Sequence, residues 1–284
     1  MNRILVTGAS GHIGTELVNL LKARGADFAV MSSRPGSAAA GVLGIPGDFA
    51  DPASLQRAFS GFDTLFLLLP LVPNKLELAR NAVQAAKAAG VRHIVRSSGA
   101  GADAASPVSL ARLQGSIDQL VVESGIAHTF LRPATFMQNL VNFSAAQIKG
   151  GTLYAPHGDG AQSLVDVRDI AECAAVVLAD PAAHAGQAYT LTGGEAFSNA
   201  QQMALVSRAI GRPVAYVDVP EAAAVEAMQG MGVPAPLIGW FMSLNHVVKQ
   251  GWAAGISGDV AALTGHPPRR LEAFIAENVA AWRA

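Results

Sequence analysis

The chain has little cysteine, little charge and few histidines, and each shortage excludes a class of protein. One cysteine in 284 residues cannot form an internal disulfide, and this is typical of a reducing compartment. Lysine and arginine number 20 against 21 acidic residues, so the net charge of −1 offers no strongly basic surface for nucleic acid. The seven histidines show no H-x-H or H-E-x-x-H spacing, so we expect no metal site.

Long hydrophobic runs are also missing, although 51% of the residues are apolar. The most apolar stretch, residues 65–72, is far shorter than the ~20 residues that a membrane span needs. It is typical of a central parallel strand that is covered on both faces. No signal peptide is expected before the first strand, and the sequence therefore predicts a cytoplasmic protein without a membrane partner.

Three glycines close to the N-terminus give the strongest functional signal. Gly8, Gly11 and Gly14 follow a short apolar run at residues 3–6 and precede apolar residues with helical spacing at 13–24. A glycine-rich turn between a strand and a helix is typical of dinucleotide binding, because the free N–H groups of the helix face the phosphates. The spacing here is G-x-x-G-x-x-G rather than G-x-G-x-x-G.

The end of the second expected strand, residues 28–31, indicates which dinucleotide binds. No acidic residue lies between Asp27 and Asp48, where one would contact a ribose 2′-hydroxyl. Ser33 and Arg34 follow the strand instead and are suited to a 2′-phosphate, which favours NADPH over NADH. The alternative is that Arg34 is a solvated loop residue.

Further strand ends supply other candidates for the same edge of the sheet. A strand at residues 64–69 brings Leu69 and Pro70 to the cofactor, and a strand at 91–99 ends in Ser97 and Ser98. A helix over about 74–89 separates these two strands. The serine pair alone is also compatible with ordinary turn chemistry. Asp51 before Pro52 predicts a helix N-cap, and residues 198–201 predict a capping box.

Three motifs resemble one family of reductases. Residues 7–14 are similar to the TGA-x-G-x-x-G turn of extended and atypical short-chain dehydrogenase/reductases. Gly47, Asp48 and Phe49 match a segment whose acid approaches the adenine amino group, with a local turn as the alternative role for Asp48. The Arg-Pro-x-x-Phe-Met-x-Asn stretch at 132–139 resembles the NmrA-like branch, which includes bacterial quinone reductases and triphenylmethane-dye reductases.

The chain departs from the short-chain pattern at the catalytic residues. These reductases commonly carry a Tyr and a Lys on the helix after the fifth strand, whereas this chain has residues 110–114, Leu-Ala-Arg-Leu-Gln. Gln114 can bind a ribose hydroxyl but cannot donate a proton as a phenol does. The catalytic residue is therefore left unknown, with Ser98 as a weak candidate.

The predicted site combines the residues of these motifs. Those expected to bind the cofactor are Gly8, Ser10, Gly11, His12, Ile13, Gly14, Ser33, Arg34, Asp48, Phe49, Leu69, Pro70, Ser97, Gln114, Pro133 and Phe136. Those expected to contact the substrate are Ser98, Phe136, Met137, Gln138 and Asn139. Phe136 also fits the apolar stripe of a helix, so a role in the core is the alternative.

Together these features predict an α/β fold with a doubly wound, mainly parallel sheet of the Rossmann type. The dinucleotide-binding core spans about residues 1–136, segments at about 160–190 return to it, and 137–284 form mainly a substrate lobe. The resemblance implies an NADPH-dependent reductase that passes hydride to a quinone or another conjugated aromatic acceptor, with a small aromatic molecule as its partner. The alternative is a non-catalytic NADP(H)-binding redox sensor of the NmrA type. The oligomeric state is left open.

Overall fold

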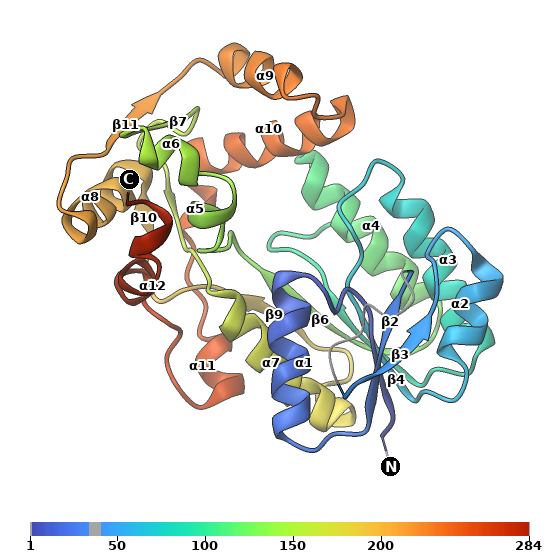
Figure 1. Ribbon diagram of the computed structural model, residues 1–284. Coiled ribbons are helices and arrows are strands. Elements are labelled where there is room, and N and C mark those ends of the chain that lie inside the picture. Colours follow the sequence, from blue (N-terminus) through green and yellow to red (C-terminus); the bar gives the residue numbers. More distant parts are fainter. Residues whose placement is uncertain (1, 34–40, 284) are drawn as a thin grey trace. The chain divides into compact units, whose positions relative to one another are not determined.

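The computed structural model describes residues 2–33 and 41–283 and divides into two compact units (Figure 1). The first unit contains residues 1–107, 111–133 and 167–190, apart from those not described. The second unit contains residues 108–110, 134–166 and 191–284, with the same restriction. Each unit has its own hydrophobic core.

A seven-stranded sheet forms the centre of the first unit. Its strand order is β3-β2-β1-β4-β5-β6-β9, and the pairings from β3 to β6 are parallel. The strands are β1 (Ile4–Val6), β2 (Phe28–Ser32), β3 (Leu43–Pro46), β4 (Thr64–Leu67), β5 (His93–Ser97), β6 (Ala127–Pro133) and β9 (Ala188–Leu191). This order reverses direction between β1 and β4, as in a doubly wound fold. The predicted fold class is confirmed, and β4 is buried along its whole length.

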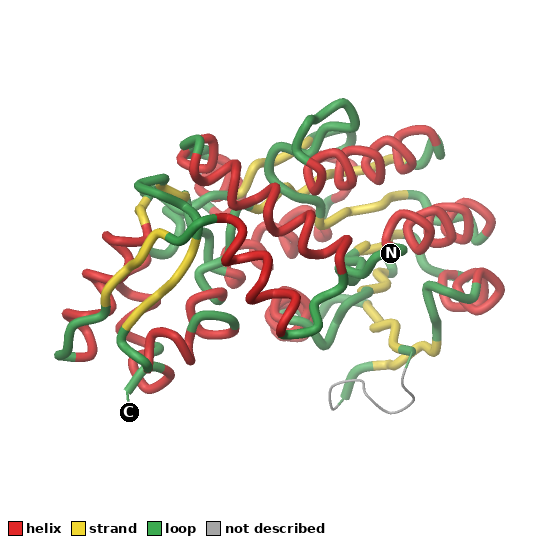
Figure 2. The backbone as a smooth tube through the Cα atoms, turned by 90° about the horizontal axis from the view of Figure 1, so that it is seen from above, coloured by secondary structure: helices red, strands yellow, loops and turns green. Residues whose placement is uncertain are grey.

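Helices cover both faces of this sheet, as expected for parallel strands (Figure 1). They are α1 (His12–Ala23), α2 (Pro52–Phe59), α3 (Lys75–Ala88), α4 (Ser109–Glu123) and α7 (Val167–Ala179). Helices α1 and α7 pack against each other, while α2, α3 and α4 share a core with the opposite face of the strands. Figure 2 shows the strands, in yellow, with helices, in red, beside them, seen from above.

Two predicted helix starts are confirmed in detail. The Asp51 carboxylate accepts hydrogen bonds from the backbone N–H groups of Ala53 and Ser54, and Pro52 occupies the first helical position of α2. Ser198 and Gln201 form the predicted capping box at the start of α8 (Asn199–Ile210). These caps satisfy N–H groups that have no partner inside their helices.

The second unit contains short strands and many helices. Strand β7 (Thr152–Ala155) pairs in parallel with β11 (Ala215–Asp218), and β8 (Ala161–Gln162) pairs antiparallel with β10 (Phe197–Ser198). Its other helices are α5 (Asn139–Asn142), α6 (Ala145–Lys149), α9 (Glu221–Gly230), α10 (Ala235–Lys249), α11 (Asp259–Thr264) and α12 (Leu271–Glu277). Trp282 is fully buried, and its indole N–H donates to the Leu140 carbonyl at 3.1 Å. Within the described ranges, no helix has the length and apolar character that crossing a membrane requires.

Candidate cofactor site

The glycine turn joins the carboxyl end of β1 to the start of α1. Gly8 has a φ of +67°, which side-chain-bearing residues rarely adopt. Gly11 is the N-cap of α1 and provides no side-chain acceptor to the first turn, which also contains no acidic residue. The N-terminal end of α1 therefore keeps the positive character that attracts phosphate.

Gly14 allows this turn to pack directly against the helix. A Cβ atom at Gly14 would lie 2.1 Å from the Gly8 carbonyl oxygen, and this contact involves backbone that cannot move aside. A Cβ at Gly11 would meet only that same oxygen, at 3.4 Å. Thr7 fixes the other side of the turn, since its hydroxyl accepts from the Leu68 N–H at 2.9 Å. The turn thus has the shape of a pyrophosphate cradle, and its residues fit a dinucleotide.

A cavity of about 820 Å³ opens at this turn, entirely within the first unit. It is a suitable size for a small ligand or half of a dinucleotide. Its lining includes predicted cofactor residues from four separate chain segments, namely Gly8, Ser10, Gly11, Ser33, Asp48, Phe49, Leu69 and Pro70. Thr15, Asn19, Leu68 and Leu78 also line it and were not predicted. Ile13 and Gly14 are buried beneath the turn, and His12 is exposed.

Asp48 lies at the edge of this cavity after β3. One of its carboxylate oxygens accepts from the Ala50 N–H at 2.9 Å, and its backbone N–H donates to Ser54 Oγ at 2.9 Å. These bonds form a local turn, yet the side chain remains exposed and lines the cavity. Asp48 therefore forms the local turn, and its carboxylate keeps acceptor capacity, while its contact with an adenine amino group stays a prediction.

A second hollow of about 440 Å³ shares Ser33, Gly47 and Asp48 with the first. Arg57 of α2 lines it, and its side chain makes no hydrogen bond or ion pair with another described residue. The predicted phosphate ligand Arg34 lies outside the described residues. Arg57 was not predicted, because a single arginine on an amphipathic helix carries no sequence signal of its own.

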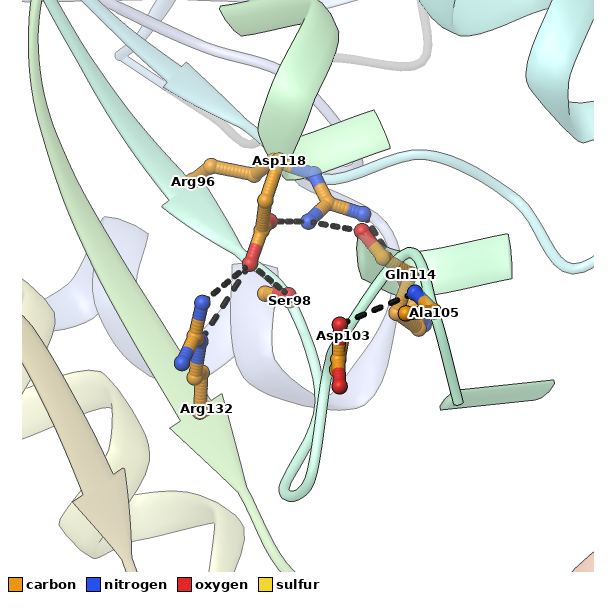
Figure 3. A network of polar contacts seen from close by, with 7 residues as sticks. All are labelled: Arg96, Ser98, Asp103, Ala105, Gln114, Asp118 and Arg132. Atoms are coloured by element: carbon orange, nitrogen blue, oxygen red, sulfur yellow. Dashed lines mark hydrogen bonds and ion pairs between the residues drawn. The ribbon is translucent and has the colours of Figure 1, made fainter. Parts of the chain in front are cut away.

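A buried ionic network occupies the carboxyl ends of β5 and β6 (Figure 3). The Asp118 carboxylate of α4 pairs with Arg96 of β5 through one oxygen and with Arg132 of β6, at 2.9 Å, through the other. The Ser98 hydroxyl donates to the same carboxylate at 3.1 Å. Burial, followed by the nearby charge of Arg132, lowers the pKa of Arg96, while the ion pair with Asp118 favours the charged guanidinium.

This network fixes the orientation of Gln114. Arg96 Nη2 donates to the Gln114 side-chain oxygen, so the amide nitrogen is the end that is left to donate elsewhere. That nitrogen lies beside Gly99, where a built Cβ would be 3.7 Å from it. Gly115 brings α4 close to the loop before it, since a Cβ there would lie 2.1 Å from the Asp103 carbonyl carbon.

Lys75, the first residue of α3, is also buried here and is only 5% exposed. It forms no ion pair or side-chain hydrogen bond with another described residue. Burial, and then the charge of Arg96, lowers the pKa of Lys75 to about 7. The sequence analysis missed Lys75, Arg96, Asp118 and Arg132. An arginine inside an apolar strand was the available signal for this buried network.

The remaining predicted residues have varied surroundings. Ser97 and Pro133 are buried at the ends of β5 and β6. In the second unit, Phe136 is half-buried and its backbone pairs with Val165, while Asn139 is half-buried at the start of α5. Met137 belongs to the core of that unit, and Gln138 Nε2 donates to Asp166 at 2.9 Å. Their predicted contacts with cofactor and substrate stay predictions.

The sheet order and the glycine turn define a nucleotide-binding protein of the doubly wound class. The chain belongs to the NmrA-like family, whose model matches residues 1–262. It is 39% identical to the NAD(P)H azoreductase of Xenophilus azovorans over 99% of both chains.

Two solved structures are similar over almost the whole chain. The NADPH complex of an NADPH-dependent quinone oxidoreductase from Escherichia coli has a TM-score of 0.88 and 28% identity, covering 96% of this chain and 99% of that one. The triphenylmethane reductase of Citrobacter sp. has a TM-score of 0.87 and 26% identity, covering 98% and 99%. These relatives and the glycine turn place the chain among the NAD(P)H-dependent oxidoreductases.

Proposed function

We propose that this protein is an NADPH-dependent reductase that passes hydride to a conjugated aromatic acceptor such as a quinone, an azo dye or a triphenylmethane dye. The observation that carries the proposal is the combination of a dinucleotide cradle with α4. Where short-chain reductases commonly place a phenol and a lysine, this helix presents the Gln114 amide, held by Arg96. Such an amide can orient a ligand but cannot supply a proton.

The absence of a phenol and a lysine from α4 selects the kind of acceptor. A nicotinamide cofactor supplies the hydride when it is bound, and the chain's own residues have to orient the two reactants. Reducing a simple ketone requires a proton donor for the developing alkoxide. Quinones and azo compounds spread the added negative charge over a conjugated system, and solvent can protonate the product. A cationic dye is neutralised by the hydride and needs no proton. The names of the relatives support this acceptor class.

The preference for NADPH over NADH is part of the same proposal. Ser33 contributes to both hollows, and the exposed Arg57 guanidinium lines the second without a partner among the described residues. Both groups are suited to a 2′-phosphate, which arginine binds through charge-assisted hydrogen bonds. Neither Asp48 nor Asp51 follows β2 directly, so no acid takes the usual place of the NAD-selective carboxylate.

A second candidate is a redox sensor that binds NADP(H) without turnover. The missing phenol and lysine favour it as much as they favour a reductase of conjugated acceptors. We also propose a cytoplasmic location, which is supported by the single cysteine, Cys173, buried in α7.

Cofactor oxidation by the purified protein separates the two candidates. We would follow NADPH absorbance with a panel of quinones, azo dyes and triphenylmethane dyes, and run NADH in parallel. Acceptor-dependent oxidation that is faster with NADPH supports the reductase. Binding of NADPH without oxidation by any acceptor overturns it and favours the sensor, whereas a preference for NADH contradicts the assigned phosphate contacts.

A further inference from the structure

The ionic network contains more positive than negative charge. Arg96 and Arg132 both pair with the Asp118 carboxylate, and the buried Lys75 interacts electrostatically with Arg96. The other carboxylate that acts on the cluster is Asp103, which faces Arg132 from the loop before α4. Counting both carboxylates, the cluster carries one excess positive charge while Lys75 is protonated and none after Lys75 loses its proton.

Lys75 is the member of this cluster that is suited to change charge near neutral pH. Arg96 and Arg132 are held as cations by direct contact with Asp118. Lys75 lacks such a contact, is buried, and interacts electrostatically with Arg96 of β5. Arg96 in turn pairs with Asp118 of α4, which also pairs with Arg132 of β6, so the charge of Lys75 is added to a network from three elements.

The cluster lies on the opposite half of the sheet from the adenine-side residues. The cavity at the glycine turn is lined from the ends of β1, β2, β3 and β4. A doubly wound sheet binds one mononucleotide over each half, beyond the carboxyl ends of its strands. The adenosine half therefore belongs to β1–β3, and the nicotinamide half belongs to β4–β6. Arg96 and Arg132 are each the next-to-last residue of their strands on that second half.

Oxidation of a nicotinamide ring gives it a positive charge, whereas the reduced ring is neutral. We propose that the cluster of Lys75, Arg96, Arg132, Asp118 and Asp103 makes the site bind NADPH more tightly than NADP⁺, and that NADP⁺ binding drives the proton from Lys75. The physical cause is repulsion between like charges in a poorly solvated site. The inference rests on the proposed NADPH site, but it depends on neither turnover nor the identity of the acceptor.

The direction of the expected pH dependence follows from the linkage between NADP⁺ binding and the protonation of Lys75. Raising the pH removes the Lys75 proton, so NADP⁺ then meets a cluster without excess charge and binds more tightly. NADPH binding does not change in this way. The 2′-phosphate titrates in both cofactors, and its effect cancels in the ratio of their dissociation constants. If the ring charge lowers the pKa of Lys75 by about 1, the ratio of the NADP⁺ to the NADPH dissociation constant falls by about fivefold between about pH 6 and about pH 8.

Two substitutions at one position separate charge from size. Lys75→Met removes the charge, and we expect a low, pH-independent ratio of the NADP⁺ to the NADPH dissociation constant. Lys75→Arg keeps a fixed charge, and we expect a high ratio at both pH values. The matched control is Lys87→Met, which changes an exposed lysine near the far end of α3 and should leave the wild-type pH dependence intact.

The experiment is titration calorimetry with NADPH and NADP⁺ at both pH values, in buffers with different ionisation enthalpies. For the wild-type protein near pH 7 we expect about 0.4 proton to be released with NADP⁺ and none to be released through Lys75 with NADPH. This measurement needs no variant, so it decides the matter even where Lys75→Met fails to fold. A pH-independent ratio, or equal proton release with both cofactors, overturns the inference alone. Failure of both cofactors to bind overturns the proposed site and the inference together.

Discussion

Replacing Asp118 by asparagine tests how strongly the first unit depends on one buried carboxylate. The carboxylate pairs with Arg96, whose side chain is 1% exposed, and with Arg132, whose side chain is 28% exposed. Asparagine keeps the shape and one acceptor oxygen, but it removes the counter-charge of Arg96 and leaves Arg132 with Asp103 alone. Arg96 is affected most, because its charge has no access to water and its Nε has no hydrogen-bond partner even in the native protein.

Breaking a buried ion pair by removing one partner typically costs 3–5 kcal/mol, since an uncompensated charge remains in the interior. The asparagine oxygen recovers part of this, so we expect a loss of about 3 kcal/mol in the free energy of unfolding. For a chain of this size, that loss lowers the melting temperature by roughly 6–12 °C.

Urea unfolding followed by circular dichroism measures this loss. The matched control is Glu123→Gln at the exposed end of α4, where the carboxylate accepts from Gln119 at 2.7 Å. We expect a change within about 0.5 kcal/mol for the control. A loss below about 1 kcal/mol for Asp118→Asn would show that the network is solvated and that the inference about its excess charge has no basis.

Three further predictions concern the cofactor turn, the second hollow and a buried histidine. Gly14→Ala should weaken NADPH binding more than about tenfold in fluorescence titrations, because its Cβ would collide with the Gly8 carbonyl; unchanged affinity would refute the cradle. Arg57→Gln should raise the KM for NADPH about fivefold and leave that for NADH unchanged, which steady-state kinetics measures; equal effects on both would refute a phosphate contact. Burial, followed by His128 and His184, lowers the pKa of His93 to about 4, so the neutral form stabilises the fold above about pH 6.5. This stabilisation should be lost as the pH falls toward about 4, and His93→Gln should flatten that part of the stability profile; an unchanged slope would contradict the assignment.

The sequence alone predicted the elements that depend on local patterns. The strand–turn–helix at Gly8, Gly11 and Gly14, the cap at Asp51 and the buried strand β4 each lie within a few adjacent residues. The predicted ends of the strands were less accurate. The predicted strands over 64–69 and 91–99 end at Leu67 and Ser97, because the residues beyond them turn into the loops at the carboxyl edge of the sheet.

The ionic network could not be predicted in the same way. Its members come from α3, β5, α4 and β6, and their proximity depends on the sheet order rather than on spacing along the chain. Arg96 in a fully buried strand was a sign of a buried partner, but the partner Asp118 lies on a helix where an acid is ordinarily solvated. Lys75 was missed for the same reason, because a lysine at the start of a helix is usually exposed.

The most direct test of the proposed reaction follows an isotope from cofactor to acceptor. Each of the two 4-deuterated forms of NADPH would be oxidised by a triphenylmethane dye in the presence of the protein, and the product would be analysed by mass spectrometry. Direct hydride transfer predicts that one form delivers deuterium to the central carbon of the dye, where it does not exchange with water. A decolourised product without deuterium from either form would contradict hydride transfer within this site.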